Sequence, residues 1–550
     1  GDRLLVLANL SPPAGPAMPG AFDFQRVAWF QQLGAVGYAL APAAVVARGT
    51  PDGWIGRIDS LRADVTARIL AALPGPEGGV AAALLTGEQS AVDRDITQQM
   101  RDSGLAHILS ISGLHIVFVV ALVMGVVRYG IALVPALALR VDAKKIGAVI
   151  ALAAALFYTG LAGAPVPAQR ACAMAGFALV AVLLDRTALS LRLVAWSAVI
   201  VLAIAPESLT GASFQMSFAA VIALIGAWES VAGWRRRLHE RAEGQRWRWA
   251  RRLAAMLGAS LATTLIASVA TGAFAAYHFN RLSLLGIVAN LLGVPLTGFW
   301  IMPWGLVAML LMPLGLERVG LVPMGWGVEG LDTIARVVGT WPDAATLVPS
   351  LPGLSLWLVT LGGLWLCLWR RRWRLAGLPV VLAGLLVPPP SAPDLLMNDD
   401  GRVLGLRDQR GVVHVASTRS DRFAGDTWAR RSGQDGARRW TVSADEAAAG
   451  LGCVGGLCRW RKGPWQVALV SDERRLAEAC ASADIVLATV DAQARCRGPR
   501  VVIDRRDAWR DGAQALWLDE GGVRRETGAG QRGNRPWVPG SASRRALSVA

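Results

Sequence analysis

Lysine, histidine and cysteine are scarce in this chain of 550 residues. Only three lysines, Lys144, Lys145 and Lys462, stand among 56 basic residues, and the chain has five histidines and six cysteines. Gly-Lys dipeptides are absent, so the chain has no P-loop of the kind in which that lysine reaches the phosphates of ATP. We therefore expect no ATP-driven motor of that class within this chain.

Acidic side chains are also rare in the middle of the chain, because residues 108–390 hold ten of them against 22 basic ones. The chain is 53% hydrophobic with a mean hydropathy of +0.41, and its apolar runs are concentrated in this stretch. Runs of that length can cross a hydrocarbon layer of ~30 Å. We predict a polytopic α-helical membrane protein with spans near 111–130, 146–161, 168–184, 191–205, 212–228, 256–277, 354–369 and 375–388, and a broken stretch at 284–314.

Two arginine clusters orient these predicted spans. Residues 229–255 hold eight arginines against three glutamates, and residues 370–374 read "RRRWR". Positively charged loops remain on the cytoplasmic side, so both clusters are expected there. The stretch 284–314 must then cross twice or not at all, and its two arms around "PLTGFWIMPWG" are too short for full spans. We predict a re-entrant or broken hairpin that lines a cavity, and both soluble ends on the outer side.

The flanking segments have a different composition. Residues 1–57 read as short strands and turns, the end of a β domain, and residues 58–107 as amphipathic helices that lead into the membrane part at 108–390. Residues 391–550 read as a soluble α+β or α/β domain. Its expected strands are "RVLGLRD", "GVVHVAS", "ADIVLATV" and "RVVIDRR", and its expected helix is "SDERRLAEACASA".

Four of the six cysteines fall in the C-terminal segment, namely Cys453, Cys458, Cys480 and Cys496. Four cysteines permit three pairings, and an oxidising compartment would allow two disulfides. We predict Cys453–Cys458 and Cys480–Cys496. Cys172 and Cys367 lie in apolar helices and are expected to be inert.

The segment "HILSISGLH", residues 107–115, places polar groups at the start of an apolar run. On a helix, His107, Ser110, Ser112 and His115 fall within an arc of about 200°, so one side is wet and the other apolar. Such groups either face a water-filled path or serve interhelical packing, to which Gly113 would contribute close approach. A metal site is disfavoured, because two histidines eight residues apart with no nearby carboxylate make a poor ligand set.

The stretch "GLAHILSISGLHI" resembles the signature of the ComEC/Rec2 competence family. Further matches follow in order: "PGAFDFQRVAWFQQLGAVGYA", "AALLTGEQSAVD", "PVPAQRACAMAG", "PESLTGASFQMSFAAV" and "YHFNRLSLLGIVANLLGVPL". The resemblance covers about residues 1–390. It implies a multi-pass channel of the bacterial inner membrane that takes up single-stranded DNA during natural transformation. It also implies that residues 1–57 end a periplasmic OB-like domain.

The family's C-terminal domain often has a metallo-β-lactamase-like fold with nuclease activity. That chemistry needs an H-x-H-x-D-H cluster with further histidines, since two metal ions must be held. Residues 391–550 contain one histidine, His414. We therefore expect a degenerate, periplasmic copy of that fold with no catalytic residues, metal or cofactor. A membrane-anchored metallohydrolase is a disfavoured alternative.

A DNA path should be hydrated and not strongly acidic. Its candidate lining, besides the His–Ser segment, consists of Arg170, Gln215, Ser217, Asn280 and Asn290. For Arg170 the alternative is a snorkelling arginine at the interface, and for Gln215 and Ser217 it is helix-to-helix hydrogen bonding. A small-solute or ion transporter is the remaining alternative, although such proteins typically carry intramembrane Asp or Glu.

Inward movement of an anion against a potential that is negative inside costs roughly 2.3 kcal/mol per charge per 100 mV. Another protein must therefore supply the energy. The resemblance implies a cytoplasmic helicase or translocase and a periplasmic DNA receptor as partners. Membrane lipid is a further partner, and a homo-oligomer is possible.

Overall fold

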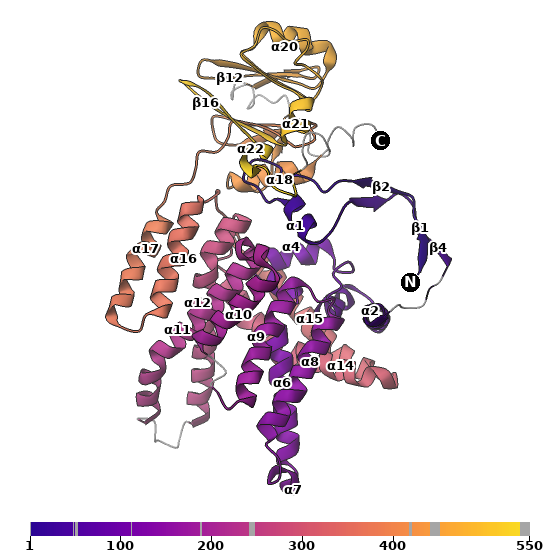
Figure 1. Ribbon diagram of the computed structural model, residues 1–550, viewed down its shortest axis with the longest axis vertical. Helices are drawn as coiled ribbons and strands as arrows, with labels where there is room; N and C mark the ends of the chain where they lie inside the picture. Colours follow the sequence, from indigo (N-terminus) through magenta and orange to yellow (C-terminus); the bar gives the residue numbers. More distant parts are fainter. Residues whose placement is uncertain are drawn as a thin grey trace. The chain divides into compact units, whose positions relative to one another are not determined.

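The computed structural model describes residues 2–47, 49, 53–111, 113–186, 190–240, 248–416, 421–440 and 451–538 (Figure 1). The chain divides into two compact units. Unit 1 comprises Gly1–Asp2, Arg48–Thr346 and Pro352–Val387, and unit 2 comprises Arg3–Ala47, Leu347–Leu351 and Pro388–Ala550. Unit 2 thus combines both ends of the chain, whereas the sequence boundaries at 57, 107 and 390 separate them.

Unit 1 is helical. Its helices are α2 (Gly53–Ala72), α3 (Pro76–Thr86), α4 (Arg94–Asp102), α5 (Ala106–Leu109), α6 (Gly113–Ala132), α7 (Pro135–Ala138), α8 (Ala143–Leu161), α9 (Val166–Leu183), α10 (Leu191–Ile204), α11 (Ala212–Glu240), α12 (Arg248–Phe279), α13 (Gly286–Leu296), α14 (Met302–Leu311), α15 (Arg318–Gly339), α16 (Gly353–Leu368) and α17 (Gly377–Leu385). Two-residue strands β5 (Arg281–Leu282) and β6 (Thr346–Leu347) follow α12 and α15.

Five helical stretches are long and apolar enough to cross a membrane: Gly113–Ala132, Ala143–Leu161, Ala212–Val231, Ala254–Phe279 and Gly286–Leu314. Shorter apolar helices occupy Pro167–Leu183, Leu191–Ile204 and Gly353–Leu368. The prediction of a helical protein with candidate membrane spans is confirmed at this level, and most helices coincide with the predicted spans to within a few residues. At the predicted span 375–388, α17 has nine residues and is not among these stretches. Part of the arginine-rich stretch 229–255, residues 241–247, lies outside the described residues.

Helix α3 forms the centre of the largest core in unit 1. All residues from Gly78 to Thr86 are buried, because α3 is apolar on every side and packs against α2, α5, α14 and α15. Its C-terminal carbonyl groups accept hydrogen bonds from side chains of neighbouring helices. The Tyr158 hydroxyl donates to Leu84 O at 2.7 Å, and Arg62 Nε donates to Thr86 O at 2.9 Å. These bonds satisfy acceptors that a helix end leaves open.

The prediction of a re-entrant hairpin at 284–314 is wrong. Residues 286–314 form one helical stretch, in which Thr297–Ile301 is a π-helical turn between α13 and α14. Pro295 and Pro303 lack the N–H that an α-helix would use there, and the wider turn absorbs their rings without reversing the chain. The reversal comes later, at Gly315 (φ 72°), and α15 then packs back along α14.

Unit 2 begins with two short ribbons. Strand β1 (Arg3–Leu5) pairs with β4 (Ala44–Ala47), and β2 (Ala8–Ser11) pairs with β3 (Val36–Ala39), both antiparallel. Between them, helix α1 (Phe24–Phe30) starts at Asp23, whose side chain accepts a hydrogen bond from the backbone N–H of Arg26.

Residues 15–30 pack onto the C-terminal part of the chain. The N–H of Gly15 donates to Asp399 Oδ2 at 2.8 Å, and the Trp428 indole donates to Ala17 O at 2.9 Å. Ala17 and Met18 are buried in the same apolar cluster as Trp428. Because these contacts are both polar and apolar, the N-terminal segment belongs to the C-terminal fold, and this is why unit 2 crosses the predicted boundaries.

The C-terminal part contains two sheets. The first has the order β10-β9-β8-β7-β16-β17 and the second the order β11-β12-β13-β14-β15. The strands of the first sheet are β7 (Leu395–Met397), β8 (Leu404–Arg407), β9 (Val413–Val415), β10 (Arg438–Arg439), β16 (Gln514–Asp519) and β17 (Gly522–Thr527). Those of the second are β11 (Leu451–Val454), β12 (Leu457–Lys462), β13 (Trp465–Val470), β14 (Ile485–Ala488) and β15 (Val501–Ile503). The five C-terminal segments expected from the sequence, four strands and one helix, are all present.

Alternation along the strands builds a layered core. Leu395 and Met397 face the second sheet, whereas Leu396 faces helix α18 (Arg422–Arg431). In the second sheet, Val467 and Leu469 face inward, whereas Ala468 and Val470 face helix α20 (Leu476–Ser482). The result is a helix, two sheets and a helix in successive layers. Helices α21 (Arg505–Asp511) and α22 (Gly528–Arg532) complete the unit.

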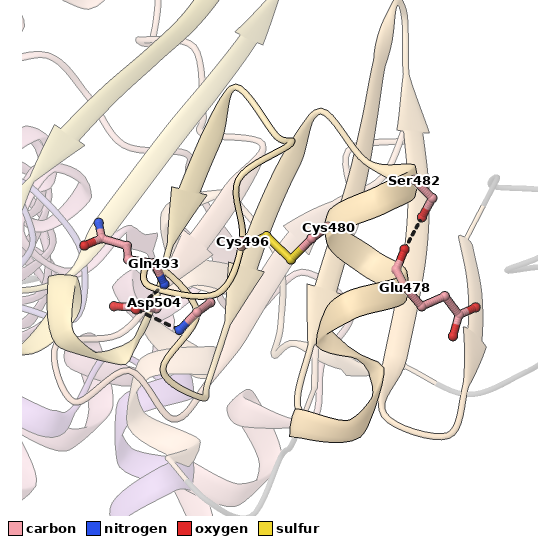
Figure 2. Close-up of a disulfide and its surroundings, with 7 residues drawn as sticks. Glu478, Cys480, Ser482, Gln493, Cys496 and Asp504 are labelled. Atoms are coloured by element: carbon pink, nitrogen blue, oxygen red, sulfur yellow. Dashed lines mark hydrogen bonds between the residues drawn. A yellow bond between two sulfur atoms is a disulfide. The ribbon is translucent and has the colours of Figure 1, made fainter.

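The structure pairs the cysteines as the sequence analysis expects. Cys453 and Cys458 are joined across the β11–β12 hairpin. Figure 2 shows the second disulfide, from Cys480 on α20 to Cys496 in the loop that carries Gln493. The backbone N–H of Gln493 donates to Asp504 Oδ2 at 3.0 Å, so this loop is held at two points.

Candidate functional site

Arg170 lies at the start of α9, where Pro165 and Pro167 favour the first helical turn. Its side chain is buried, with 5% of the residue exposed. Nη2 donates to the hydroxyl of Ser213, in the first turn of α11, at 2.5 Å. No described carboxylate forms an ion pair with Arg170, so its positive charge is met within the described chain by a neutral hydroxyl.

Gln215 lies two residues further along α11 and connects this helix to α12. Its Oε1 is 2.8 Å from His278 Nε2, and its amide donates to Leu209 O at 3.1 Å. His278 is on the last turn of α12. From the sequence, Gln215 could line a path or form a helix-to-helix hydrogen bond, and the structure shows the hydrogen bond.

The residues that follow α12 meet the end of α4. Asn280 is buried and has a φ of 55°, a left-handed conformation that asparagine adopts more readily than most residues, and it ends the helix. Arg281 Nη1 then forms a salt bridge with Asp102 Oδ1 at 2.6 Å. Arg281 follows His278 by three positions, so their Cα atoms are at most about 11 Å apart. The α11–α12 pair and the α4 end therefore adjoin one another.

The His–Ser segment continues from this point. His107 Nδ1 is 3.2 Å from Gly104 O, and a Cβ on Gly104 would lie 2.9 Å from Ser283 Oγ. Gly113, at the start of α6, packs against Ala171 of α9, because its Cβ would lie 3.6 Å from that side chain. His115 is fully buried on α6. Ser110 is half-buried after α5, and Ser112 lies outside the described residues.

We call the set Asp102, His107, Arg170, Ser213, Gln215, His278 and Arg281 the polar end of unit 1. It collects residues from α4, α5, α9, α11 and α12 where these helices meet. It carries two guanidinium groups and one carboxylate, so it has an excess of positive charge. A hydrated anion is the ligand that such an arrangement suits.

Two candidates stand apart from these contacts. Ser217 is exposed on α11. Asn290 lies one turn along α13 from Gly286, whose Cβ would lie 3.2 Å from Ser103 O. Its Oδ1 is buried and has no hydrogen-bond partner among the described residues. Asn290 therefore lies one turn from the polar end, on the same face of α13 as Gly286.

Ser213, His278, Asp102 and Arg281 belong to the polar end but were not singled out from the sequence. Serine, histidine and an Asp–Arg pair are common in other roles, and their partners are 43 to 179 residues away. The sequence offers one clue to Ser213, because it lies two residues from Gln215, which is a predicted path residue.

Unit 2 offers no metal centre among the described residues, because no group of three or more His, Cys, Asp or Glu side chains is suitably placed. The single histidine, His414, is buried on β9 with Nε2 3.1 Å from Asp408 Oδ2. The His414 ring thus pairs with the carboxylate of Asp408, which directly follows β8 of the first sheet.

Five candidate membrane-spanning helical stretches, a polar end that contains a buried arginine, and a sheet-rich unit with two disulfides define the class of helical membrane proteins. The chain belongs to the competence protein family, because the family model described as "Competence protein" matches residues 84–373, more than half of the chain. That range includes the whole polar end.

Parts of the chain are also similar to curated relatives. The chain is 24% identical over 307 residues to ComE operon protein 3 of Bacillus subtilis, 30% identical over 315 residues to competence protein ComA of Neisseria gonorrhoeae, and 29% identical over 308 residues to the uncharacterized protein YcaI of Escherichia coli. The matches cover 56%, 56% and 54% of this chain but 35%, 41% and 36% of those relatives. No solved structure matches the chain.

Proposed function

We propose that this protein is a channel of the bacterial inner membrane through which one DNA strand enters the cell during transformation. The observation that carries the proposal is the polar end: a buried arginine without a carboxylate partner among the described residues, set where apolar helices meet. A hydrated and weakly cationic passage suits a polyanion. The path residues in this proposal are His107, Ser110, Ser112, Gly113, His115, Arg170, Gln215, Ser217, Asn280 and Asn290.

The chain segments that make up unit 2 support an arrangement with both soluble ends on the periplasmic side. Residues 347–351, between α15 and α16, belong to unit 2, where the N–H of Ser350 donates to Arg431 O at 3.0 Å. Three separate parts of the chain thus fold into one body and must share one side of the membrane. Because positively charged loops remain on the cytoplasmic side, the turn "RRRWR" between the paired helices α16 and α17 is expected there.

We propose that unit 2 is not a nuclease. Its layers of helix, sheet, sheet and helix suit a degenerate metallo-β-lactamase-like fold in which disulfides replace metal ions as cross-links. The ribbons of residues 3–11 and 36–47 suit the end of an OB-like domain. Metal-dependent cleavage of DNA by the purified full chain would contradict this part of the proposal.

The proposal requires partners. A strand moving inward as an anion opposes the membrane potential, and the chain has no P-loop, so a cytoplasmic helicase or translocase must pull. A periplasmic receptor would deliver DNA, lipid surrounds unit 1, and a homo-oligomer would be compatible with a shared passage.

The test is uptake of labelled DNA by a strain from which the gene has been deleted. We expect loss of nuclease-protected internal strand while DNA still binds to the cell surface, and recovery when the full chain is restored. Normal internal label in the deletion strain would defeat the proposal.

One observation favours a proton- or ion-coupled transporter instead. Asp332 of α15 has a buried Oδ1 with no hydrogen-bond partner among the described residues. Asp332→Asn keeps the shape of the side chain and removes its charge. The channel proposal predicts DNA uptake within about twofold of the wild type, because a charge that repels DNA is not needed. Abolished uptake with normal membrane abundance would favour coupling through this carboxyl group.

A further inference from the structure

We propose that Arg170 and Ser213 form a binding site for backbone phosphates of the entering DNA strand, positioned by the neighbouring Gln215–His278 hydrogen bond. This inference rests on the proposed function and names the groups that would contact the strand. Ser213 and His278 were not among the residues that the sequence analysis assigned to the path.

Burial sets Arg170 apart, because no other described arginine of unit 1 is buried. Arg62, Arg68, Arg281 and Arg370 each form a salt bridge, with Glu88, Glu317, Asp102 and Glu229 respectively. Arg170 is more deeply buried, and its one described side-chain partner is a hydroxyl. A buried cation without an opposite charge is costly, so such a group is retained where an anion is to be bound. A guanidinium has five N–H donors in a fork that matches phosphate oxygens.

The hydroxyl of Ser213 marks the open side of the site. Ser213 is exposed whereas Arg170 is buried, so a phosphate that arrives beside Ser213 meets the guanidinium directly behind it. Ser213 also lies in the first turn of α11, a helix of 29 residues with no acidic residue in that turn. The free N–H groups and the positive end of the helix dipole add to the attraction for an anion.

The position of Arg170 favours a strand passing inside the bundle over a lipid headgroup. One turn further along α9, Met174 packs against the cluster of Phe214, Phe218, Val194 and Val201 from α10 and α11. Arg170 is on the same helix face, since residues four apart are neighbours on a helix. That face is directed at other helices, whereas lipid contacts outward-facing side chains.

The Gln215–His278 bond positions the site. It ties the first turn of α11 to the last turn of α12, close to Ser213 along the chain. Without it, the Ser213 hydroxyl would no longer be held against Arg170, although neither Gln215 nor His278 needs to touch the strand.

The first experiment measures DNA uptake in cells that carry single variants of the full chain. Arg170→Gln removes the charge, Arg170→Lys keeps the charge but loses the fork, and Ser213→Ala removes the hydroxyl. Arg192→Gln is the matched control, because Arg192 is exposed in the first turn of α10, where α9 has already ended. We expect internal DNA to fall at least about tenfold with Arg170→Gln and by less with the other two, with Arg192→Gln unchanged. Membrane abundance is measured in each strain.

Deletion and substitution have distinguishable outcomes. Normal uptake in the deletion strain overturns the proposed function. Loss of uptake on deletion together with normal uptake by Arg170→Gln overturns only this inference. Should Arg170→Gln be missing from the membrane, Arg170→Lys and Ser213→Ala decide in its place: normal uptake in both contradicts the site.

The second experiment uses the purified full chain in detergent and a short fluorescent oligodeoxythymidine. Each phosphate contact contributes about 0.7 to the slope of log affinity against log salt for a single strand, so Arg170→Gln should flatten the slope by about that amount. A neutral methylphosphonate oligomer should bind equally to wild type and variant. An unchanged slope overturns the inference. So does a variant that binds the oligomer normally but loses co-purifying anionic phospholipid, because Arg170 would then be a lipid ligand.

Discussion

At the residue scale, Asp399 shows how a single carboxyl group can make the fold sensitive to pH. Burial raises its pKa to about 6, and the charges of Asp400 and Asp421 act in the same direction, whereas the hydrogen bond from the Gly15 N–H lowers it. Asp399 therefore binds its proton more tightly in the folded chain than in the unfolded one. Its contribution to stability is complete below the ordinary pKa of 3.8 and is lost as the pH rises through about 6.

Asp399→Asn should remove this dependence, because the amide is neutral at every pH and its oxygen can still accept from Gly15. We expect residues 13–30 to be held more firmly above pH 6, by on the order of 1–2 kcal/mol. Hydrogen exchange of those amides in the full chain, compared across pH, measures the effect. Asp435→Asn is the control, since Asp435 is exposed in the same unit. An equal change in both variants would contradict a specific role of Asp399.

Gly320 is a residue at which any side chain should be destructive. A Cβ there would lie 2.4 Å from the backbone nitrogen of Ala308, so α15 and α14 could not approach. Gly320→Ala should destabilise this helix pair by about 1–3 kcal/mol through overpacking. In Gly363→Ala the new Cβ meets nothing within 4 Å, so little change is expected. Thermal unfolding of the purified full chain follows both, and similar melting temperatures would show that α14 and α15 can separate freely.

How far the polar end could be predicted depends on the distance between partners. Arg170, Gln215 and Asn280 are unusual residue types within apolar runs, so the sequence identifies them alone. Ser213 and His278 are ordinary until their partners are known, and those partners lie 43 and 63 residues away. Local patterns carry no information on such pairing.

At the element scale, the predictable features were those set by periodicity and length. Alternation predicted β8, β9, β14 and β15, and apolar length predicted α6, α8 and α12. The stretch 286–314 was misjudged because proline and glycine signal a break in the helix but not its form. Proline and glycine are compatible both with a π-helical turn and with a chain reversal. Which of the two forms depends on how closely α15 packs against α14 and Trp300, and Gly320 and Gly327 permit that close packing.

The two disulfides should differ in their contribution to unit 2. Cys480 and Cys496 are 16 residues apart, and Cys453 and Cys458 are five apart. Closing the longer loop removes more freedom from the unfolded chain, which predicts a loss of about 3 kcal/mol for the double serine variant of Cys480 and Cys496 against roughly 2 kcal/mol for the other pair. Denaturant unfolding of the full chain, followed by tryptophan fluorescence, compares them. The reverse order would indicate that the loop-closure argument does not govern these bonds.

At the scale of the whole molecule, the sequence predicted the kinds of segment but not their grouping. Composition distinguishes apolar from soluble stretches but carries no information on which distant segments contact each other. It therefore cannot reveal that residues 15–30 pack on a sheet that begins at Leu395. That grouping depends on long-range bonds such as the one from the Trp428 indole to Ala17 O. It has a consequence for the membrane topology, because one folded body cannot lie on both sides of a bilayer.

Cysteine labelling tests this consequence directly. Gln31→Cys and Glu520→Cys place thiols at exposed positions of unit 2 that are far apart in sequence, and Arg371→Cys places one at the exposed turn between α16 and α17. In spheroplasts treated with a membrane-impermeant maleimide, we expect the first two to react and the third to react only after permeabilisation. Cys172 and Cys367 lie in α9 and α16, so the unsubstituted chain supplies the background. Opposite accessibility of Gln31→Cys and Glu520→Cys would mean that the N-terminal segment does not fold with the C-terminal sheets in the membrane-embedded protein, because a shared core requires a shared compartment.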